Sequence, residues 1–186
     1  ICNNTIIVSN QSMTGTQING SGSDAQVRNC VFINTRNGVI ADAVGADRII
    51  ITNNTFENMS VNGVLLSNIS NVNFTNNTIR GSQNGIRLNN GENNSVDNNI
   101  FYNLSDFGII LRNQTTANAR NNNISNITFS GIQLDLDVPL QNRTTFNHSI
   151  SGNYLCGIRR EAVRITNYVA DNTLNGLVSA NTFCNS

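Results

Sequence analysis

The sequence repeats a unit of 22 to 31 residues that reads Asn-Asn-x-Ile/Phe, a few polar residues, and then Gly-Ile/Val-x-Leu/Ile. The large apolar residue after the asparagine pair marks the register of each unit: Ile6, Phe32, Phe56, Ile79, Phe101, Ile124, Leu155 and Phe183. Five positions earlier, every unit has a second apolar residue: Ile1, Val27, Ile51, Phe74, Val96, Ala119, Ile150 and Val178. A unit of this length cannot bury its own apolar residues, so the pattern predicts units stacked on one another.

Within each unit apolar and polar residues alternate, as in Gly85-Ile86-Arg87-Leu88, which is the period of a β-strand. We therefore predict an all-β solenoid of about eight coils with three short strands per coil. Parallel pairing would place matching residues about 4.8 Å apart. A two-sheet sandwich is the main rival fold, but it would not require the same register in every unit.

The corners between strands are rich in asparagine, which tolerates left-handed backbone angles, and glycine is expected at other corners for the same reason. The asparagine pairs are expected to hydrogen-bond from coil to coil: Asn53–Asn54, Asn76–Asn77, Asn98–Asn99 and Asn121–Asn122. Opposite charges also occupy matching positions in neighbouring units: Glu57 with Arg80, Asp97 with Arg120, and Arg112 with Asp135. Exposed pairs contribute only about 0 to 1 kcal/mol each, so they serve mainly as support for the alignment.

The units Asn53-Asn54-Thr55-Phe56 to Gly63-Val64 and Asn76-Asn77-Thr78-Ile79 to Gly85-Ile86 resemble parallel β-helix repeats. Such repeats occur in pectate-lyase-like enzymes, NosD-type periplasmic proteins, phage tailspikes and surface adhesins. The resemblance covers nearly the whole chain and is clearest over residues 48–134. It implies a right-handed parallel β-helix in one domain over residues 1–186, either a whole protein or a piece of a longer one. It implies no particular activity, because many activities share this fold.

The chain has four cysteines, whose pairing indicates the cellular compartment of the protein. Cys156 and Cys184 each follow the register residue by one position, which predicts Cα atoms about 5 Å apart and a disulfide. Cys2 and Cys30 differ by two positions in register, so a disulfide and two free thiols both stay open. No Cys-x-x-Cys motif occurs and the single histidine, His148, lies apart from the cysteines, so no zinc site is expected. Paired cysteines are typical of secreted, periplasmic or cell-surface proteins.

Asn-x-Ser/Thr sequons are frequent, among them Asn58-Met59-Ser60 and Asn73-Phe74-Thr75. They fit N-glycosylation in a host that glycosylates. A repeat rich in asparagine and threonine also creates sequons by composition alone, and many of them are expected in the corner ladder.

The longest unit has its extra residues at 133–149, where four side chains are candidates for catalysis: Asp135, Asp137, Arg143 and His148. Alternation predicts that both aspartates point outward about 6.5 to 7 Å apart, at the lower edge of the spacing in inverting glycosidases. Resemblance to polygalacturonase-type enzymes would imply further acids, histidine and lysine from neighbouring coils. This chain has no lysine and none of their Asn-Thr-Asp, Asp-Asp or Gly-His-Gly motifs. We therefore interpret Asp135 as a partner of Arg112 and Asp137 as a solvated turn residue.

Arginines are the candidates for ligand binding, because a guanidinium can hold a carboxylate or sulfate with two hydrogen bonds. The candidates are Arg87, Arg112, Arg159, Arg160 and Arg164. The last three form a dense charged cluster with Glu161, which also fits an ordinary charged rim. Carboxylates suited to calcium are not clustered, so no cofactor or metal is expected, and a bound calcium ion would be adventitious.

The outward positions of the glycine-containing segments form one further column: Ile40, Leu65, Arg87, Ile110, Gln133 and Arg164. Apolar residues at outward positions suggest covering by the chain's own loops, by a ligand, or by a second copy in a homo-oligomer.

The chain has zero formal net charge and no apolar stretch long enough for a bilayer, so neither a nucleic-acid partner nor membrane insertion is expected. Outward ionisable groups are sparse and mostly matched between coils. This favours a non-catalytic extracellular or cell-surface module, such as an adhesin, spike or envelope component, that presents a rigid face to a glycan or a cell-surface protein. The alternative is a polysaccharide-degrading enzyme, a glycoside hydrolase or polysaccharide lyase, acting on an acidic polysaccharide.

Overall fold

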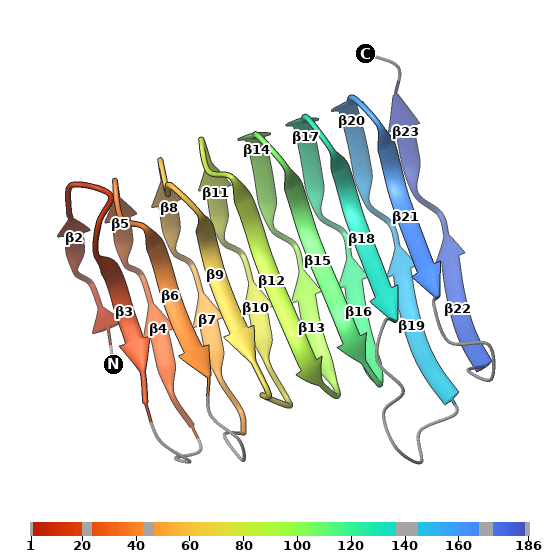
Figure 1. Ribbon diagram of the computed structural model, residues 1–186, viewed down its shortest axis with the longest axis horizontal. Coiled ribbons are helices and arrows are strands. Elements are labelled where there is room, and N and C mark those ends of the chain that lie inside the picture. Colours follow the sequence, from red (N-terminus) through yellow and green to blue (C-terminus); the bar gives the residue numbers. More distant parts are fainter. Residues whose placement is uncertain (1, 20–23, 43–46, 137–144, 168–172, 185–186) are drawn as a thin grey trace.

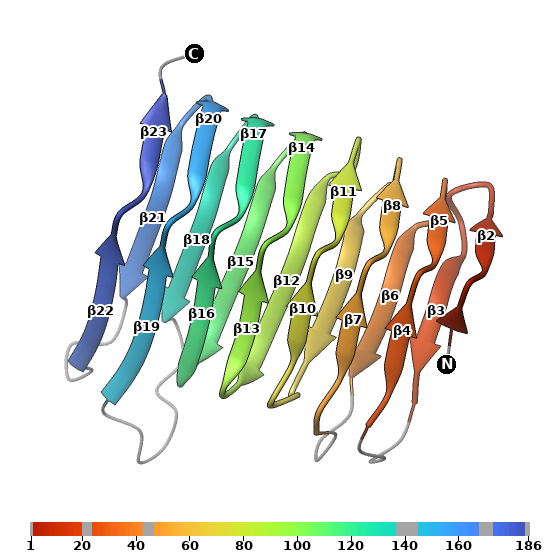
Figure 2. The same ribbon diagram turned by 180° about the vertical axis from the view of Figure 1, so that it is seen from behind.

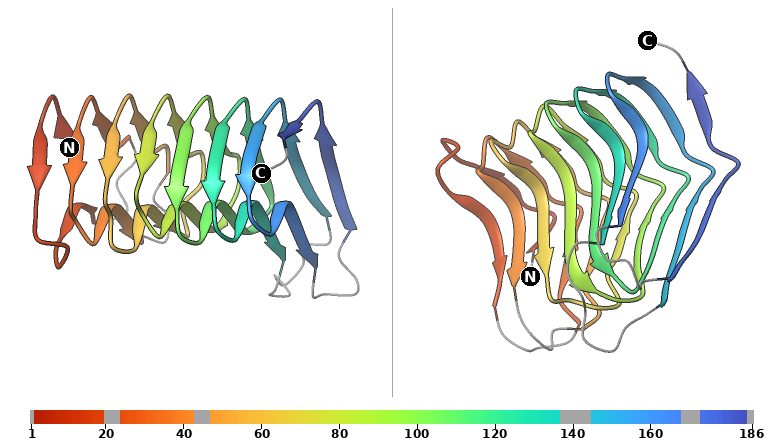
Figure 3. Two further views of the ribbon diagram at one scale, coloured as in Figure 1. Left: turned by 90° about the horizontal axis from the view of Figure 1, so that it is seen from above. Right: turned by 45° about the vertical axis from the view of Figure 1, so that its right-hand side comes forward.

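The computed structural model describes residues 2–19, 24–42, 47–136, 145–167 and 173–184, which form 23 β-strands and no helix. Successive coils stack along the long axis of the molecule, with the two chain ends at opposite ends of the stack (Figures 1 and 3). Every pair of neighbouring strands is parallel. The predicted fold class, an all-β parallel solenoid, is confirmed.

Three parallel sheets run along the stack, with orders that rise by three in strand number because each coil gives one strand to each sheet. Sheet A contains β1(Cys2–Asn3), β4(Gln26–Arg28), β7(Ile50–Thr52), β10(Asn73–Thr75), β13(Asn94–Asp97), β16(Thr116–Arg120), β19(Thr145–Ser151) and β22(Thr173–Ser179). Sheet B contains β2(Ile6–Val8), β5(Val31–Ile33), β8(Thr55–Glu57), β11(Thr78–Arg80), β14(Ile100–Leu104), β17(Asn123–Ile127), β20(Tyr154–Ile158) and β23(Thr182–Cys184). Sheet C contains β3(Thr14–Ile18), β6(Asn37–Asp42), β9(Asn62–Ser67), β12(Asn84–Gly91), β15(Phe107–Gln114), β18(Ser130–Leu136) and β21(Glu161–Asn167). Figure 1 looks onto sheet C, and Figure 2 looks onto sheets A and B from behind.

The predicted register holds from the second coil onward. Phe56, Ile79, Phe101 and Ile124 pair in one continuous column of sheet B, and all four are fully buried. Aromatic rings reinforce this core, since the Phe32 and Phe56 rings stack with centroids 4.9 Å apart. Burial of large side chains in aligned columns is the main favourable term that holds the coils together.

The register predicted for the first coil is wrong by one residue. Ile7, rather than Ile6, pairs with Phe32, and Cys2, rather than Ile1, pairs with Val27. The left-handed corner residue of this coil is Asn4, at φ 51°, and the strand begins from that corner. In the later coils that have an asparagine pair, the left-handed corner is the first asparagine of the pair, but in the first coil it is the second. Counting from the asparagine pair therefore places the first-coil register one residue too early.

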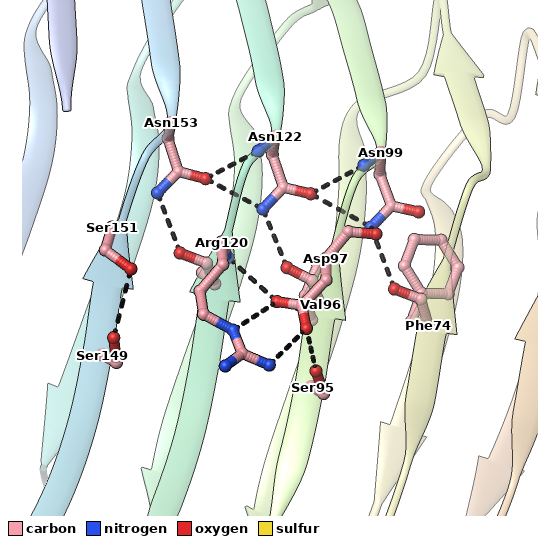
Figure 4. A network of polar contacts seen from close by, with 11 residues as sticks. Phe74, Ser95, Val96, Asp97, Asn99, Arg120, Asn122, Ser149, Ser151 and Asn153 are labelled. Carbon is pink, nitrogen blue, oxygen red and sulfur yellow. Dashed lines mark hydrogen bonds and ion pairs between the residues drawn. The ribbon is translucent and has the colours of Figure 1, made fainter. Parts of the chain in front are cut away.

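Only the second asparagine of each pair enters the buried ladder: Asn54, Asn77, Asn99 and Asn122. Asn153, which follows Gly152, continues the ladder in the next coil. The Asn122 carboxamide donates to Val96 O (2.8 Å) and to Asn153 Oδ1 (3.0 Å), while its Oδ1 accepts from the backbone and side-chain nitrogens of Asn99 (Figure 4). The first asparagine of each pair is exposed at positive φ, as in Asn98 at 58°. The first asparagine of each pair therefore forms a solvent-facing corner, and the second belongs to a buried chain of hydrogen bonds.

This division also corrects the expectation that many sequons lie in the ladder. The residue two positions after a ladder asparagine faces the core, because strand side chains alternate, and it must be apolar. Asn54 is followed at that distance by Phe56, and Asn77 by Ile79. No ladder asparagine among the described residues can therefore be a sequon acceptor.

The glycines that begin the sheet C strands serve close packing and not the left-handed corner that was predicted. The backbone at Gly85 does not have a positive φ. A Cβ at Gly85 would lie 2.3 Å from the Gly108 carbonyl oxygen and 2.5 Å from the Phe101 ring. The chain needs glycine there because the next coil and the core ring leave no room.

Two of the predicted charge pairs form salt bridges, Arg80 with Glu57 and Arg120 with Asp97. The third pair, Arg112 and Asp135, occupies matching positions on neighbouring strands of sheet C.

The predicted disulfide joins Cys156 to Cys184, with Cα atoms 4.8 Å apart on neighbouring strands of sheet B. Cys30 is also disulfide-bonded. The side chain of Cys2, the partner considered for Cys30, lies outside the described residues.

Candidate functional site

A polar groove lies on the outer face of sheet C, where strands β6, β9, β12 and β15 end side by side (Figure 1). Its volume is about 460 Å³, and we call it the sheet C groove. The lining residues are Asp42, Ser67, Asn68, Arg87, Asn89, Asn90, Arg112 and Asn113. The groove thus brings together two of the predicted ligand-binding arginines, from adjacent coils.

Strand register explains how the groove is built. Asp42, Ser67, Asn89 and Arg112 occupy matching positions on four consecutive strands and form one outward column along the floor. Arg87 lies two residues before Asn89, so it projects from the same face in the neighbouring column. Arg112, in the floor column, and Arg87, in the neighbouring column, therefore lie diagonally on adjacent coils.

The corner asparagines form one wall of the groove. Asn68, Asn90 and Asn113 all have left-handed backbone angles, with φ between 51° and 58°. Their carboxamides form a chain in which Asn113 Nδ2 donates to Asn90 Oδ1 (3.3 Å) and Asn90 Nδ2 donates to Asn68 Oδ1 (3.2 Å). The chain ends where Asn68 Nδ2 donates to Asp42 Oδ1 (2.9 Å). Hydrogen bonds along this wall hold the amide groups in place.

The floor of the groove is also ordered by hydrogen bonds. Arg87 Nε donates to Asn89 Oδ1 at 3.0 Å, and Asn89 Nδ2 donates to Ser67 Oγ at 3.1 Å. The lining residues include two arginines and one aspartate, Asp42, which stands at the end far from Arg112. Asp135, in register with Arg112 on the next strand, is not among the lining residues. Amide and guanidinium donors beside a positive charge suit a carboxylate or sulfate group.

Of the four candidate catalytic residues the structure describes two, Asp135 on sheet C and His148 on sheet A, and these two lie on different sheets. Asp135 is 9% exposed and accepts a 2.6 Å hydrogen bond from Gln133 Nε2. Asp137 and Arg143 lie outside the described residues. His148 lies on the inner face of sheet A, between Ala117 and Gly176 of the neighbouring coils, so its imidazole points into the solenoid.

Burial changes the chemistry of His148. It lowers the pKa of the imidazole from 6.5 to about 4, although hydrogen bonds with the backbone of Ala117 and Gln114 act in the opposite direction. At neutral pH the side chain is therefore uncharged, and the residue is only 6% exposed.

The three arginines of the predicted C-terminal cluster point to different places. The Arg160 guanidinium lies 4.1 Å from the centre of the Phe129 ring. Arg159 lines a separate hollow of about 320 Å³ at the corner between sheets B and C. Arg164 lies on sheet C in register with Gln133. These residues therefore do not make a common binding site.

A second hollow, of about 530 Å³, lies on the outer face of sheet A over β16, β19 and β22, and we call it the sheet A hollow. Its lining consists of His148, Gly176 and six outward side chains: Thr116, Asn118, Asn147, Ser149, Asn175 and Leu177. None of these six outward residues carries a charge, and none was among the site residues predicted from the sequence. Their only signal in the sequence is an uncharged set of outward positions on three consecutive coils.

Other features of the described residues limit the kind of site. No group of three or more histidine, cysteine, aspartate or glutamate residues in these segments lies close enough together to hold a metal ion. The same segments contain no helix with the length and apolar character needed to cross a membrane.

The family model described as "Right handed beta helix region" matches residues 37–185. The chain belongs to this right-handed β-helix family. The match begins at β6 and includes every residue that lines the sheet C groove and the sheet A hollow. Membership of the β-helix family therefore accounts for the stacked coils on which these two sites are built. The curated proteins provide no match to this β-helix.

Proposed function

We propose that this β-helix is a non-catalytic binding module that holds an acidic polysaccharide in the sheet C groove. The observation that carries the proposal is the position of Arg87 and Arg112 on adjacent coils of one amide-lined groove. Arg87 and Arg112 lie diagonally, on adjacent strands and two residues apart along them, so each guanidinium group can meet a different acidic group of a glycan in the groove.

Rigidity supports binding in this groove. The wall amides are held by hydrogen bonds to one another, and the strands beneath them are paired on both sides. A site that is already ordered before the ligand arrives loses less conformational entropy on binding. A glycan fits the polar lining better than an apolar protein segment would.

An extracellular, periplasmic or cell-surface location is part of this proposal. The Cys156–Cys184 disulfide supports it, because such bonds persist in oxidising compartments. A role as an adhesin, spike or envelope component would follow from that location. Ile110, on the outward column of sheet C, is 5% exposed within the single chain, so a homo-oligomer is not needed to cover it.

Binding of polygalacturonate and of a sulfated glycan, measured by titration calorimetry, tests the proposal. The double variant Arg87→Ala/Arg112→Ala should lose at least tenfold in affinity, since a hydrogen bond to a charged group contributes about 1.5 to 3 kcal/mol. Arg36→Ala, which removes an exposed arginine outside the groove, is the matched control and should bind normally. Equal affinity of the double variant and the wild type would refute the proposal.

The same samples discriminate between a binding module and a polysaccharide-degrading enzyme. Incubation with these polysaccharides should release no new reducing ends and no unsaturated products. Release of either product, abolished by Asp135→Asn, would establish the enzymatic alternative.

A further inference from the structure

We infer that the sheet A hollow is a second binding site, specific for a neutral glycan. The hollow lies on a different sheet and on later coils than the sheet C groove, and it shares no residue with it. The inference is therefore independent of the function proposed above.

Register arranges the lining side chains as a grid of two columns and three coils. Thr116, Asn147 and Asn175 occupy matching positions in one column. Asn118, Ser149 and Leu177 do so in the other. Neighbouring coils are about 4.8 Å apart, and the two columns are about 6.5 to 7 Å apart along each strand. Hydrogen-bonding groups therefore recur at a fixed interval along the solenoid axis.

The chemistry of this grid selects the ligand class. Its six outward side chains provide three carboxamides, two hydroxyls and one apolar group. The one ionisable residue that lines the hollow, His148, is uncharged at neutral pH. A carboxamide both donates and accepts, which matches the hydroxyl groups of a sugar, and Leu177, 58% exposed, can contact the apolar face of a sugar ring. An acidic ligand would find no cation in the hollow, and a cation would find no carboxylate.

Part of the grid is not engaged within the protein. The Thr116 hydroxyl and the Asn118 carboxamide make no hydrogen bond with any described residue, whereas Asn175 Nδ2 donates to Asn147 Oδ1 at 3.3 Å. Polar groups that face a hollow of this size without a protein partner can exchange water for ligand hydroxyls at little cost.

The nearest charges on sheet A do not alter this character. Asp97 and Arg120 lie beside the grid and neutralise each other through their own salt bridge (Figure 4). Ser149 and Ser151 are 3.3 Å apart between hydroxyl oxygens, which orients the edge of the hollow (Figure 4). The surface offered to a ligand is therefore ordered and uncharged.

The test uses the full chain, made in a bacterial periplasm so that the disulfides form and the Asn147-His148-Ser149 sequon carries no eukaryotic N-glycan. The probes are uncharged hexasaccharides of glucose, mannose and xylose. Binding is measured by titration calorimetry and by the NMR signals of the side-chain amides. The wild type should bind at least one probe, and the Asn118 amide signals should shift on titration.

The variant Asn118→Ala/Asn147→Ala should weaken that binding at least tenfold, because two pairs of hydrogen bonds to the sugar are lost. Asn73→Ala is the matched control, since Asn73 is an exposed outward residue in the same sheet A column two coils earlier. It should bind as the wild type does, as should Arg87→Ala/Arg112→Ala. Failure of all three probes to bind, or equal binding by the Asn118→Ala/Asn147→Ala variant, would overturn the inference, while leaving the acidic-polysaccharide proposal standing.

Discussion

The Arg120 guanidinium donates two hydrogen bonds to the carboxylate of Asp97, which lies one coil earlier. Nε is 3.2 Å from Oδ1, and Nη2 is 2.7 Å from Oδ2 (Figure 4). The backbone N–H of Arg120 also donates to Asp97 Oδ1, at 3.1 Å. The pKa of Arg120 is raised, first by hydrogen bonding with Asp97 and then by its charge, while burial acts in the opposite direction. The Asp97 carboxylate thus binds both the side chain and the backbone of Arg120 and links two neighbouring coils.

Replacing Asp97 should therefore weaken the stack more than an ordinary surface pair would. Asp97 is 8% exposed, and its loss leaves a guanidinium and a backbone N–H with fewer partners. Asp97→Ala should lower the free energy of unfolding by about 2 kcal/mol, measured by urea titration. A double-mutant cycle with Arg120→Ala should give a favourable coupling of about 1 kcal/mol, and additive effects would contradict this account.

Truncation of a ladder asparagine should be more costly than truncation of its exposed neighbour. Asn99 Oδ1 accepts from the backbone and side-chain nitrogens of Asn77, and Asn99 Nδ2 donates to Phe74 O at 2.9 Å. Asn99→Ala leaves these buried groups unsatisfied and should cost about 3 kcal/mol in chemical denaturation. Asn98→Gly is the control, since glycine accepts φ 58° readily, and it should change stability by less than about 0.5 kcal/mol.

Acid should destabilise the protein through His148. The unfolded chain binds a proton on this residue near pH 6.5, whereas the folded chain binds it only near pH 4, so the unfolded state holds more protons between these values. Stability is therefore full above pH 6.5 and falls as the pH drops towards 4, by about 3 kcal/mol in total. Urea unfolding at a series of pH values measures the loss.

Substitution of His148 separates its contribution from that of other acid-sensitive groups. His148→Ala removes the titrating imidazole, and alanine already occupies the matching position at residue 117. The variant should be less stable at pH 7 but should show a shallower dependence on pH between 6.5 and 4. A pH dependence as steep as that of the wild type would show that other groups cause it.

The Cys156–Cys184 disulfide should stabilise the last coils. It closes a loop with a sequence separation of 28 residues, for which loop-closure entropy predicts about 3.6 kcal/mol. Cys156→Ser/Cys184→Ser should melt at a lower temperature than the wild type in calorimetry, and the addition of reductant should remove the difference. Identical melting of variant and wild type under oxidising conditions would contradict the predicted stabilisation.

Much of the fold was predictable because stacking imposes the same rule on every coil. Residues at equal distances from the register position become axial neighbours, which is why the Glu57–Arg80 and Asp97–Arg120 pairs and the position of the Cys156–Cys184 bond could be inferred. The rule depends on the corner that starts each strand. In the first coil that corner is Asn4, the second asparagine of its pair, and the prediction failed by one residue.

The candidate sites were only partly predictable, because a binding surface depends on how columns lie beside one another across a sheet. Arg87 and Arg112 were predicted as ligand-binding residues because a guanidinium can bind a carboxylate or sulfate. That both line one groove depends on the left-handed backbone angles at Asn90 and the neighbouring corner asparagines. In the sequence His148 was one of four candidates for catalysis among the extra residues of the longest unit. The structure places its side chain in a buried position beside Ala117 and Gly176, and these small residues leave room for an imidazole.

By itself the sequence determined which residues lie above one another along the solenoid axis, since the repeated apolar positions can be buried only when equal positions stack. The tertiary structure alone decided the register of the first coil and which side chains meet across columns to line a groove or hollow. Those outcomes depend on the backbone angles at each corner and on the space left by neighbouring coils. Neither quantity is encoded by residue spacing alone.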